Sequence, residues 1–152
     1  MNYIVNRVVM VCCVLALTVL PSLASEKKET AKKPSPQEAI EMLKEGNRRF
    51  VEGTSQYPHT DSTRLAQAGR ENQGDHAYAT VITCSDSRVP VEIIFDAGIM
   101  DIFVIRVAGN VCDVDEVGSI EYGLAHVHTP VLVVLCFPSI LRSFHIFSYF
   151  YS

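Results

Sequence analysis

Three short apolar runs constrain the fold of this chain of 152 residues more than any other feature. They occupy residues 77–83, 102–107 and 131–135, and the third run contains no polar residue. A run without polar alternation is typical of a strand covered on both faces, as in a parallel sheet. Helical patterns separate the runs, and the order strand, helix, strand, helix, strand predicts an α/β fold with a parallel β-sheet core, flanking helices and right-handed crossovers.

Capping signals and apolar spacing predict where the helices lie. We expect helices from Ser35 to just before Gly53, over 63–68, over 89–96, and from Asp113 or Asp115 to just before Pro130. The third of these follows directly after the first apolar run and is opened by a proline at position 90. In the last helix, one face should carry Val117, Ile120, Leu124 and Val127.

The first of these helices has the clearest start signal in the chain. Ser35-Pro36-Gln37-Glu38 has the order of a capping box, with proline at the first helical position. An apolar stripe at helical spacing follows, from Ile40 to Phe50. The stripe fits two arrangements: a helix packed on its own domain, which the sequence favours at this point, or an arm laid on a partner subunit.

The N-terminus has the composition of a secretory signal peptide. Arg7 supplies the positive charge, residues 8–20 are apolar, and Ser22-Leu23-Ala24 resembles a cleavage site. We therefore expect a signal peptide over 1–24, a polar linker over 25–34, and secretion to the periplasm. An apolar run of this length is too short for a membrane-spanning helix.

Charge and cysteine count exclude two further classes of protein. The formal net charge of -4 gives no electrostatic reason to bind nucleic acid. Removal of the signal peptide would leave three cysteines, Cys84, Cys112 and Cys136, and their spacing does not suggest a disulfide framework. His59 and His76 lie in or beside polar loops, where a structural histidine is more common than a metal ligand.

The strongest functional signal is Cys84-Ser85-Asp86-Ser87-Arg88, directly after the first apolar run. Sites in open α/β sheets form outside the carboxyl ends of the strands, so Ala108-Gly109 and Leu135-Cys136 should lie at the same edge. Cysteine thiolate is a good zinc ligand, and a carboxylate two residues on can bind the same ion unless an arginine holds it. A buried cysteine beside a surface Asp–Arg pair, or a reactive low-pKa thiol, fits the spacing as well.

This motif, together with 103–110 and 118–123, resembles the β-class carbonic anhydrases over about 35–135. The resemblance implies a homodimer whose helical N-terminal arm embraces the neighbouring subunit, and zinc as cofactor. It implies that Cys84 is the first zinc ligand, that Asp86 binds zinc in the resting form or holds its hydroxide, and that Arg88 pairs with Asp86. The implied reaction converts carbon dioxide and water into bicarbonate and a proton, through attack of zinc-bound hydroxide.

The sequence departs from this family directly after the third apolar run. The family continues with Gly-His and a Cys three residues later, whereas this chain has Cys136-Phe137 and Ile140. Neither Phe nor Ile can bind zinc, so two expected ligands are missing and we expect impaired or absent activity. We interpret 35–135 as the family domain and 136–152 as an aberrant apolar tail, from a truncation or frameshift after Leu135. The alternative is a non-catalytic product or pseudoenzyme that acts at most as a dimerisation module.

Overall fold

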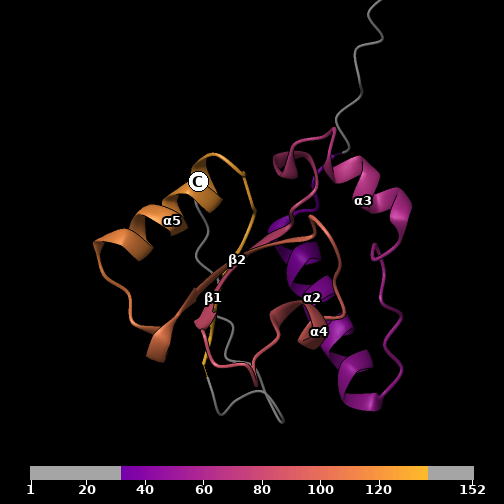
Figure 1. Ribbon diagram of the computed structural model, residues 1–152, viewed down its shortest axis with the longest axis horizontal. Coiled ribbons are helices and arrows are strands. Elements are labelled where there is room, and N and C mark those ends of the chain that lie inside the picture. The colour runs from indigo at the N-terminus through magenta and orange to yellow at the C-terminus, as the bar shows by residue number, and fades with distance from the viewer. Residues whose placement is uncertain (1–31, 137–152) are drawn as a thin grey trace, which may run out of the picture.

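The computed structural model describes residues 32–136 of the chain (Figure 1). The predicted signal peptide, most of the predicted linker and the apolar tail after Cys136 lie outside these residues. Across 32–136, no helix combines the length and the apolar character needed to cross a membrane.

Every strand and helix predicted within the described residues is present, with small shifts of the boundaries. The first strand starts two residues later than predicted and ends at Cys84, and the helix predicted over 89–96 is shorter. In chain order the elements are α2 (Pro36–Glu52), α3 (Ser62–Ala68), the 3₁₀ turn η1 (Gln73–Asp75), β1 (Ala79–Cys84), α4 (Val91–Ile94), β2 (Ile102–Val107), the 3₁₀ turn η2 (Ala108–Asn110), α5 (Val114–Ala125) and β3 (Leu132–Leu135).

The three strands form one parallel sheet in the order β2-β1-β3, which confirms the predicted α/β class. Along the first ladder Cys84 lies opposite Val107, and along the second Thr83 lies opposite Leu135. The carboxyl ends of all three strands therefore meet at one edge of the sheet.

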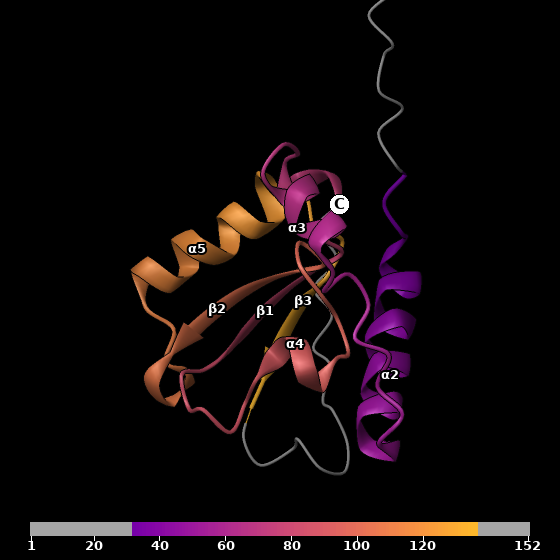
Figure 2. The same cartoon turned by 45° about the vertical axis from the view of Figure 1, so that its right-hand side comes forward.

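Helices cover both faces of this sheet. Figure 2 shows α5 on one side, and α2 and α4 on the other. The main apolar core lies between the sheet and the α2/α4 layer, and its buried residues include Leu43, Val81, Ile94, Phe95 and Val133. One expectation was wrong: β3 is not covered equally on both faces, because Leu132 and Val134 stay partly exposed while their neighbours are buried. The α5 side of this edge strand carries less cover than the α2 side.

The N-terminal helix α2 packs on the domain of its own chain. Its predicted capping box is present, because the Glu38 N–H donates to Ser35 Oγ at 3.3 Å and the Ser35 N–H donates to Glu38 Oε2 at 2.7 Å. Gly46 faces the core so closely that a Cβ added there would lie 1.8 Å from the carbonyl oxygen of Phe95. Asn47 Nδ2 donates to the Ile94 carbonyl at 3.1 Å. Contact of this helix with a neighbouring subunit stays a prediction.

Asp113, and not Asp115, caps α5, since its side chain accepts the Val114 N–H at 2.7 Å. The predicted apolar face of this helix is only partly right, because Val117 is 43% exposed. Gly123 is instead the buried residue of α5, and a Cβ there would lie 2.3 Å from Thr80 Oγ1. The helix approaches the sheet through a glycine, which an apolar pattern does not reveal.

Candidate functional site at the carboxyl edge of the sheet

Cys84 is the last residue of β1, and a tight turn follows it. The Asp86 N–H points back to Cys84 Sγ at 3.4 Å, and the Val89 N–H donates to the Asp86 carbonyl at 3.0 Å. Val89 is fully buried in the core, and Pro90 precedes the first residue of α4. The turn is therefore anchored at both ends, by a central strand and by a buried apolar side chain.

Asp86 and Arg88 form a bidentate ion pair on this turn. Arg88 Nε lies 2.9 Å from Asp86 Oδ1, and Arg88 Nη2 lies 2.7 Å from Oδ2. The Arg88 backbone N–H donates to Oδ1 as well, at 2.9 Å. These hydrogen bonds, those of the Arg88 side chain first, hold the pKa of the Asp86 carboxyl well below its usual range. The pair is accessible, with the Arg88 side chain 66% exposed and that of Asp86 30% exposed.

Backbone N–H groups from two strand ends surround the Cys84 sulfur. Hydrogen bonds from the Asp86, Gly109 and Asn110 N–H groups lower the pKa of the Cys84 thiol. Gly109 and Asn110 follow β2 and have positive φ angles of 70° and 55°, a conformation that glycine and asparagine adopt most readily. This left-handed turn aims the two N–H groups back toward the end of β1.

Arg106 is a member of the site that our sequence prediction missed. Its Nη2 donates to the Asp86 carbonyl at 2.7 Å, and its Nε donates to the Cys84 carbonyl at 3.3 Å. Arg106 is the only charged residue in the apolar run of β2, near the end that borders the site. That position was a usable signal, since a guanidinium on an exposed face next to a strand end can hold carbonyl groups of the neighbouring turn.

The third strand end contributes Cys136. Asn110 Nδ2 donates to Cys136 Sγ at 3.3 Å, so Asn110 contacts groups from both of the neighbouring strand ends. Asn110 Oδ1 is buried and has no hydrogen-bond partner among the described residues. Cys84, Cys112 and Cys136 are all free thiols within 32–136, the first partly exposed and the other two exposed.

Residues 32–136 do not complete a zinc site. Within them no group of three or more His, Cys, Asp or Glu side chains is placed to hold a metal ion. Cys84 offers one thiolate, and both carboxylate oxygens of Asp86 are hydrogen-bonded to Arg88. A protein zinc site needs three or four protein ligands. The donors within these residues are therefore too few to hold the zinc ion that the resemblance implies.

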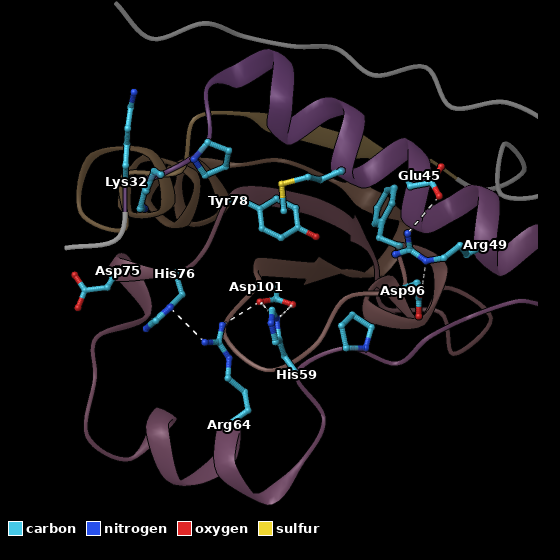
Figure 3. Close-up of a pocket in the computed structure, with 15 residues that line it drawn as sticks. Lys32, Glu45, Arg49, His59, Arg64, Asp75, His76, Tyr78, Asp96 and Asp101 are labelled. Atoms are coloured by element: carbon cyan, nitrogen blue, oxygen red, sulfur yellow. Dashed lines mark hydrogen bonds and ion pairs between the residues drawn. The ribbon is translucent and has the colours of Figure 1, made fainter. Parts of the chain in front are cut away.

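A second polar region surrounds a cavity of about 500 Å³ beside α2 (Figure 3). Its charged groups pair with one another: Arg49 Nε lies 2.5 Å from Asp96 Oδ2, and Arg64 Nη2 lies 3.0 Å from Asp101 Oδ1. His59 Nδ1 is 2.8 Å from the same Asp101 carboxylate. No residue of the Cys84 turn lines this cavity. We interpret the region as a set of structural ion pairs.

Both histidines that the sequence marked as structural contact a carboxylate through a ring nitrogen. His59 contacts Asp101, and His76 Nε2 lies 2.7 Å from Glu71 Oε2. The His76 side chain is only 15% exposed, so it is more buried than a loop position suggested.

Asp96 anchors the loop after α2 through its buried carboxylate. Burial by itself would raise the pKa of Asp96, but hydrogen bonds from the Gln56 N–H, Arg49 and the Tyr57 N–H outweigh it and lower the pKa. The bonds from the Gln56 and Tyr57 N–H groups to the carboxylate are 2.9 to 3.1 Å long. The charge is thus held by at least three donors.

The fold and the site define the chain as an α/β protein with a thiol, a carboxylate and a guanidinium at the carboxyl edge of a parallel sheet. The family model described as carbonic anhydrase matches residues 79–137, which include this edge. This match, like the relatives below, shows that these residues are similar to carbonic anhydrases.

Three relatives give the extent of the similarity. Carbonic anhydrase 2 of Mycobacterium tuberculosis is 44% identical over 101 residues, which cover 66% of this chain and 47% of that protein. A carbonic anhydrase of Mycolicibacterium smegmatis is 43% identical over 101 residues, which cover 66% of this chain and 48% of the relative. The carbonic anhydrase of Synechococcus elongatus is 35% identical over 99 residues, covering 57% of this chain and 35% of the relative. The matched part of the chain thus spans about half the length of the two mycobacterial relatives.

Proposed function

We propose that this chain carries the N-terminal part of a zinc-dependent carbonic anhydrase, which hydrates carbon dioxide to bicarbonate and a proton. The observation that carries the proposal is the arrangement of Cys84, Asp86 and Arg88 on one anchored turn within the matched residues. Cys84 would be a metal ligand. Asp86 would act beside the metal as a ligand or hydrogen-bond acceptor, and Arg88 would orient it. The family domain would comprise residues 35–135 and form a homodimer, after secretion to the periplasm.

We also propose that the carbonic anhydrase activity of this chain is impaired or absent. Phe137 and Ile140 stand where the family supplies its second and third protein ligands. Among the residues described by the structure, no three His, Cys, Asp or Glu side chains are grouped so that they could hold a metal ion. Two donors bind zinc weakly, because structural and catalytic sites need at least three protein ligands.

Metal content and carbon dioxide hydration test this proposal directly. The full chain is purified with zinc in the medium, and its zinc per subunit and its hydration rate are measured. Cys84→Ser serves as the control that removes the thiolate. We expect well under one zinc per subunit and a rate at background for both proteins. Stoichiometric zinc with rapid hydration, both lost in Cys84→Ser, would contradict the inactive state and support the metal role of Cys84.

Reading the encoding DNA across residues 135–152 in all frames tests the origin of the missing ligands. If another frame encodes a His at position 137 and a Cys three residues later, the missing ligands arise from a frameshift. If no frame does so, Phe137 and Ile140 belong to the gene product and the non-catalytic reading gains support. Sedimentation of the purified chain checks the proposed dimer independently of activity.

A further inference from the structure

Cys84 and Cys136 each come directly after the last residue pair of the ladder between β1 and β3. That pair is Thr83 and Leu135, so Cys84 ends β1 while Cys136 is the first residue past the end of β3. Residues opposite each other in a ladder point to the same face of the sheet. Neighbouring strands are about 4.8 Å apart, which lies within the Cα separation of roughly 4.4–6.8 Å found in disulfides.

Asn110 provides a second, independent sign that the two sulfurs are close. Its side-chain Nδ2 donates to Cys136 Sγ at 3.3 Å. The turn that carries Asn110 follows Val107, which lies opposite Cys84 in the ladder between β1 and β2, so Asn110 reaches the end of β3 from the turn beside Cys84. Both thiols are accessible, with Cys84 partly exposed and Cys136 exposed.

We propose that Cys84 and Cys136 form a reversible disulfide between the ends of β1 and β3, which makes this edge a thiol redox site. The oxidant is a small disulfide such as oxidised glutathione. One cysteine attacks it as thiolate, a mixed disulfide forms, and one glutathione thiol leaves. The second cysteine then displaces the second glutathione. In total the two protein thiols lose two electrons and two protons, and one glutathione disulfide becomes two thiols.

This site does not depend on the proposed hydration chemistry. Oxidation would occupy Cys84 and prevent it from binding a metal, whereas the reduced protein keeps the thiolate available. The disulfide is read out by covalent mapping, so its failure would leave the tests of zinc content and hydration unaffected.

Peptide mapping of the full chain after equilibration with reduced and oxidised glutathione tests the proposal. Remaining thiols are alkylated before digestion. Trypsin releases Cys84 in peptide 71–88 but leaves Cys112 and Cys136 together in peptide 107–142. A second protease that cuts after Glu116 and Glu121 separates those two cysteines. We expect Cys84 linked to Cys136, Cys112 alkylated, and full release of the link by a reductant.

Single variants decide whether the pairing is specific. Cys112→Ser is the matched control and should keep the cross-link. Cys136→Ser should lose it and retain glutathione on Cys84, and Cys84→Ser should lose it too. Circular dichroism checks that each variant is folded. If a variant does not fold, the disulfide map of the unaltered chain alone tests the pairing. Alkylation of all thiols, linkage of Cys84 to Cys112, Cys12 or Cys13, or a link between two chains would overturn the proposal.

Discussion

Two of the Asp–Arg pairs in residues 32–136, Arg49–Asp96 and Asp86–Arg88, differ in what surrounds them. The Asp96 side chain is fully buried and that of Arg49 is 17% exposed, whereas the Arg88 side chain on the Cys84 turn is 66% exposed. Asp96 links α2 to the loop that follows it and to the end of α4. Asp86 and Arg88 are two residues apart, and their side chains pair within one turn.

The two pairs differ in how much they contribute to the stability of the fold. A buried pair costs desolvation and is stable only when every lone pair finds a donor, as around Asp96. An exposed pair contributes little to stability because water and salt screen it. The Asp96 region therefore stabilises the α2 layer, and the Cys84 turn presents chemical groups at a rigid edge.

Asp96→Asn should have the largest effect on stability. Asn keeps the shape and tolerates the positive φ of 45° at this position, so the substitution removes mainly the charge. Loss of the charged partner leaves Arg49 with only the longer ion pair to Glu45, at 3.6 Å, and should cost about 3 kcal/mol of the free energy of unfolding. Urea denaturation measures the change.

Asp86→Asn is the matched control at the exposed pair. It should shift the urea midpoint far less than Asp96→Asn does. The Asp86–Arg88 pair is accessible to water, so its loss removes little stability. Equal shifts in the two variants would show that the buried and exposed pairs do not differ in the way that burial suggests.

Gly46→Ala should give the second-largest effect, because α2 touches the Phe95 carbonyl through this glycine. The added methyl group must push the helix away, and overpacking of this kind costs about 1–3 kcal/mol. Gly118→Ala in α5 is the matched helical control, since a Cβ there meets nothing within 4 Å. It should be neutral or slightly stabilising. A destabilised Gly118→Ala with an unaffected Gly46→Ala would contradict the tight packing of α2.

Asp96 should also make stability depend on acid. Its pKa is lowered in the folded chain, so the folded chain binds fewer protons than the unfolded chain between the two pKa values. The stabilisation is complete above the unfolded pKa of about 3.9 and is lost as the pH falls through the folded value. The urea midpoint, followed from pH 7 to pH 3, should fall less steeply in Asp96→Asn than in the unaltered chain. Parallel curves would rule out a titrating role for Asp96.

The sheet, its parallel strands and most helix boundaries could be predicted because apolar runs and capping residues report local structure. The N-cap of α2 and the full extent of β2 needed nothing beyond the sequence. Gly46 and Gly123 could not be predicted, since close backbone approach depends on partners distant in the chain. The partial exposure of β3 depends on its place at one edge of the sheet, which the run 131–135 does not reveal.

Some residues of the candidate site could likewise be predicted from the sequence, and others could not. Cys84, Asp86 and Arg88 are neighbours in the sequence, so their motif could be recognised. Arg106 and Asn110 reach the site only because β2 lies next to β1 and ends at the same edge. The proximity of Cys84 to Cys136 follows from the register of two strands that are far apart in the chain.

Arg106→Gln should produce the smallest and most local effect. Arg106 holds the Cys84 and Asp86 carbonyls from the exposed side of β2, so its loss should loosen the turn and leave the core intact. Amide hydrogen exchange over residues 85–90 should speed up about two- to tenfold, which corresponds to the roughly 0.5–1.5 kcal/mol of one hydrogen bond. The control Arg70→Gln removes an arginine whose side chain, among residues 32–136, hydrogen-bonds to the Ala66 carbonyl at the end of α3, and it should leave this segment unchanged. If exchange in the turn is equal in both variants, Arg88 and the buried Val89 suffice to hold the turn. The rigidity of the edge would then be a local property of the Cys84 motif, without help from the neighbouring strand.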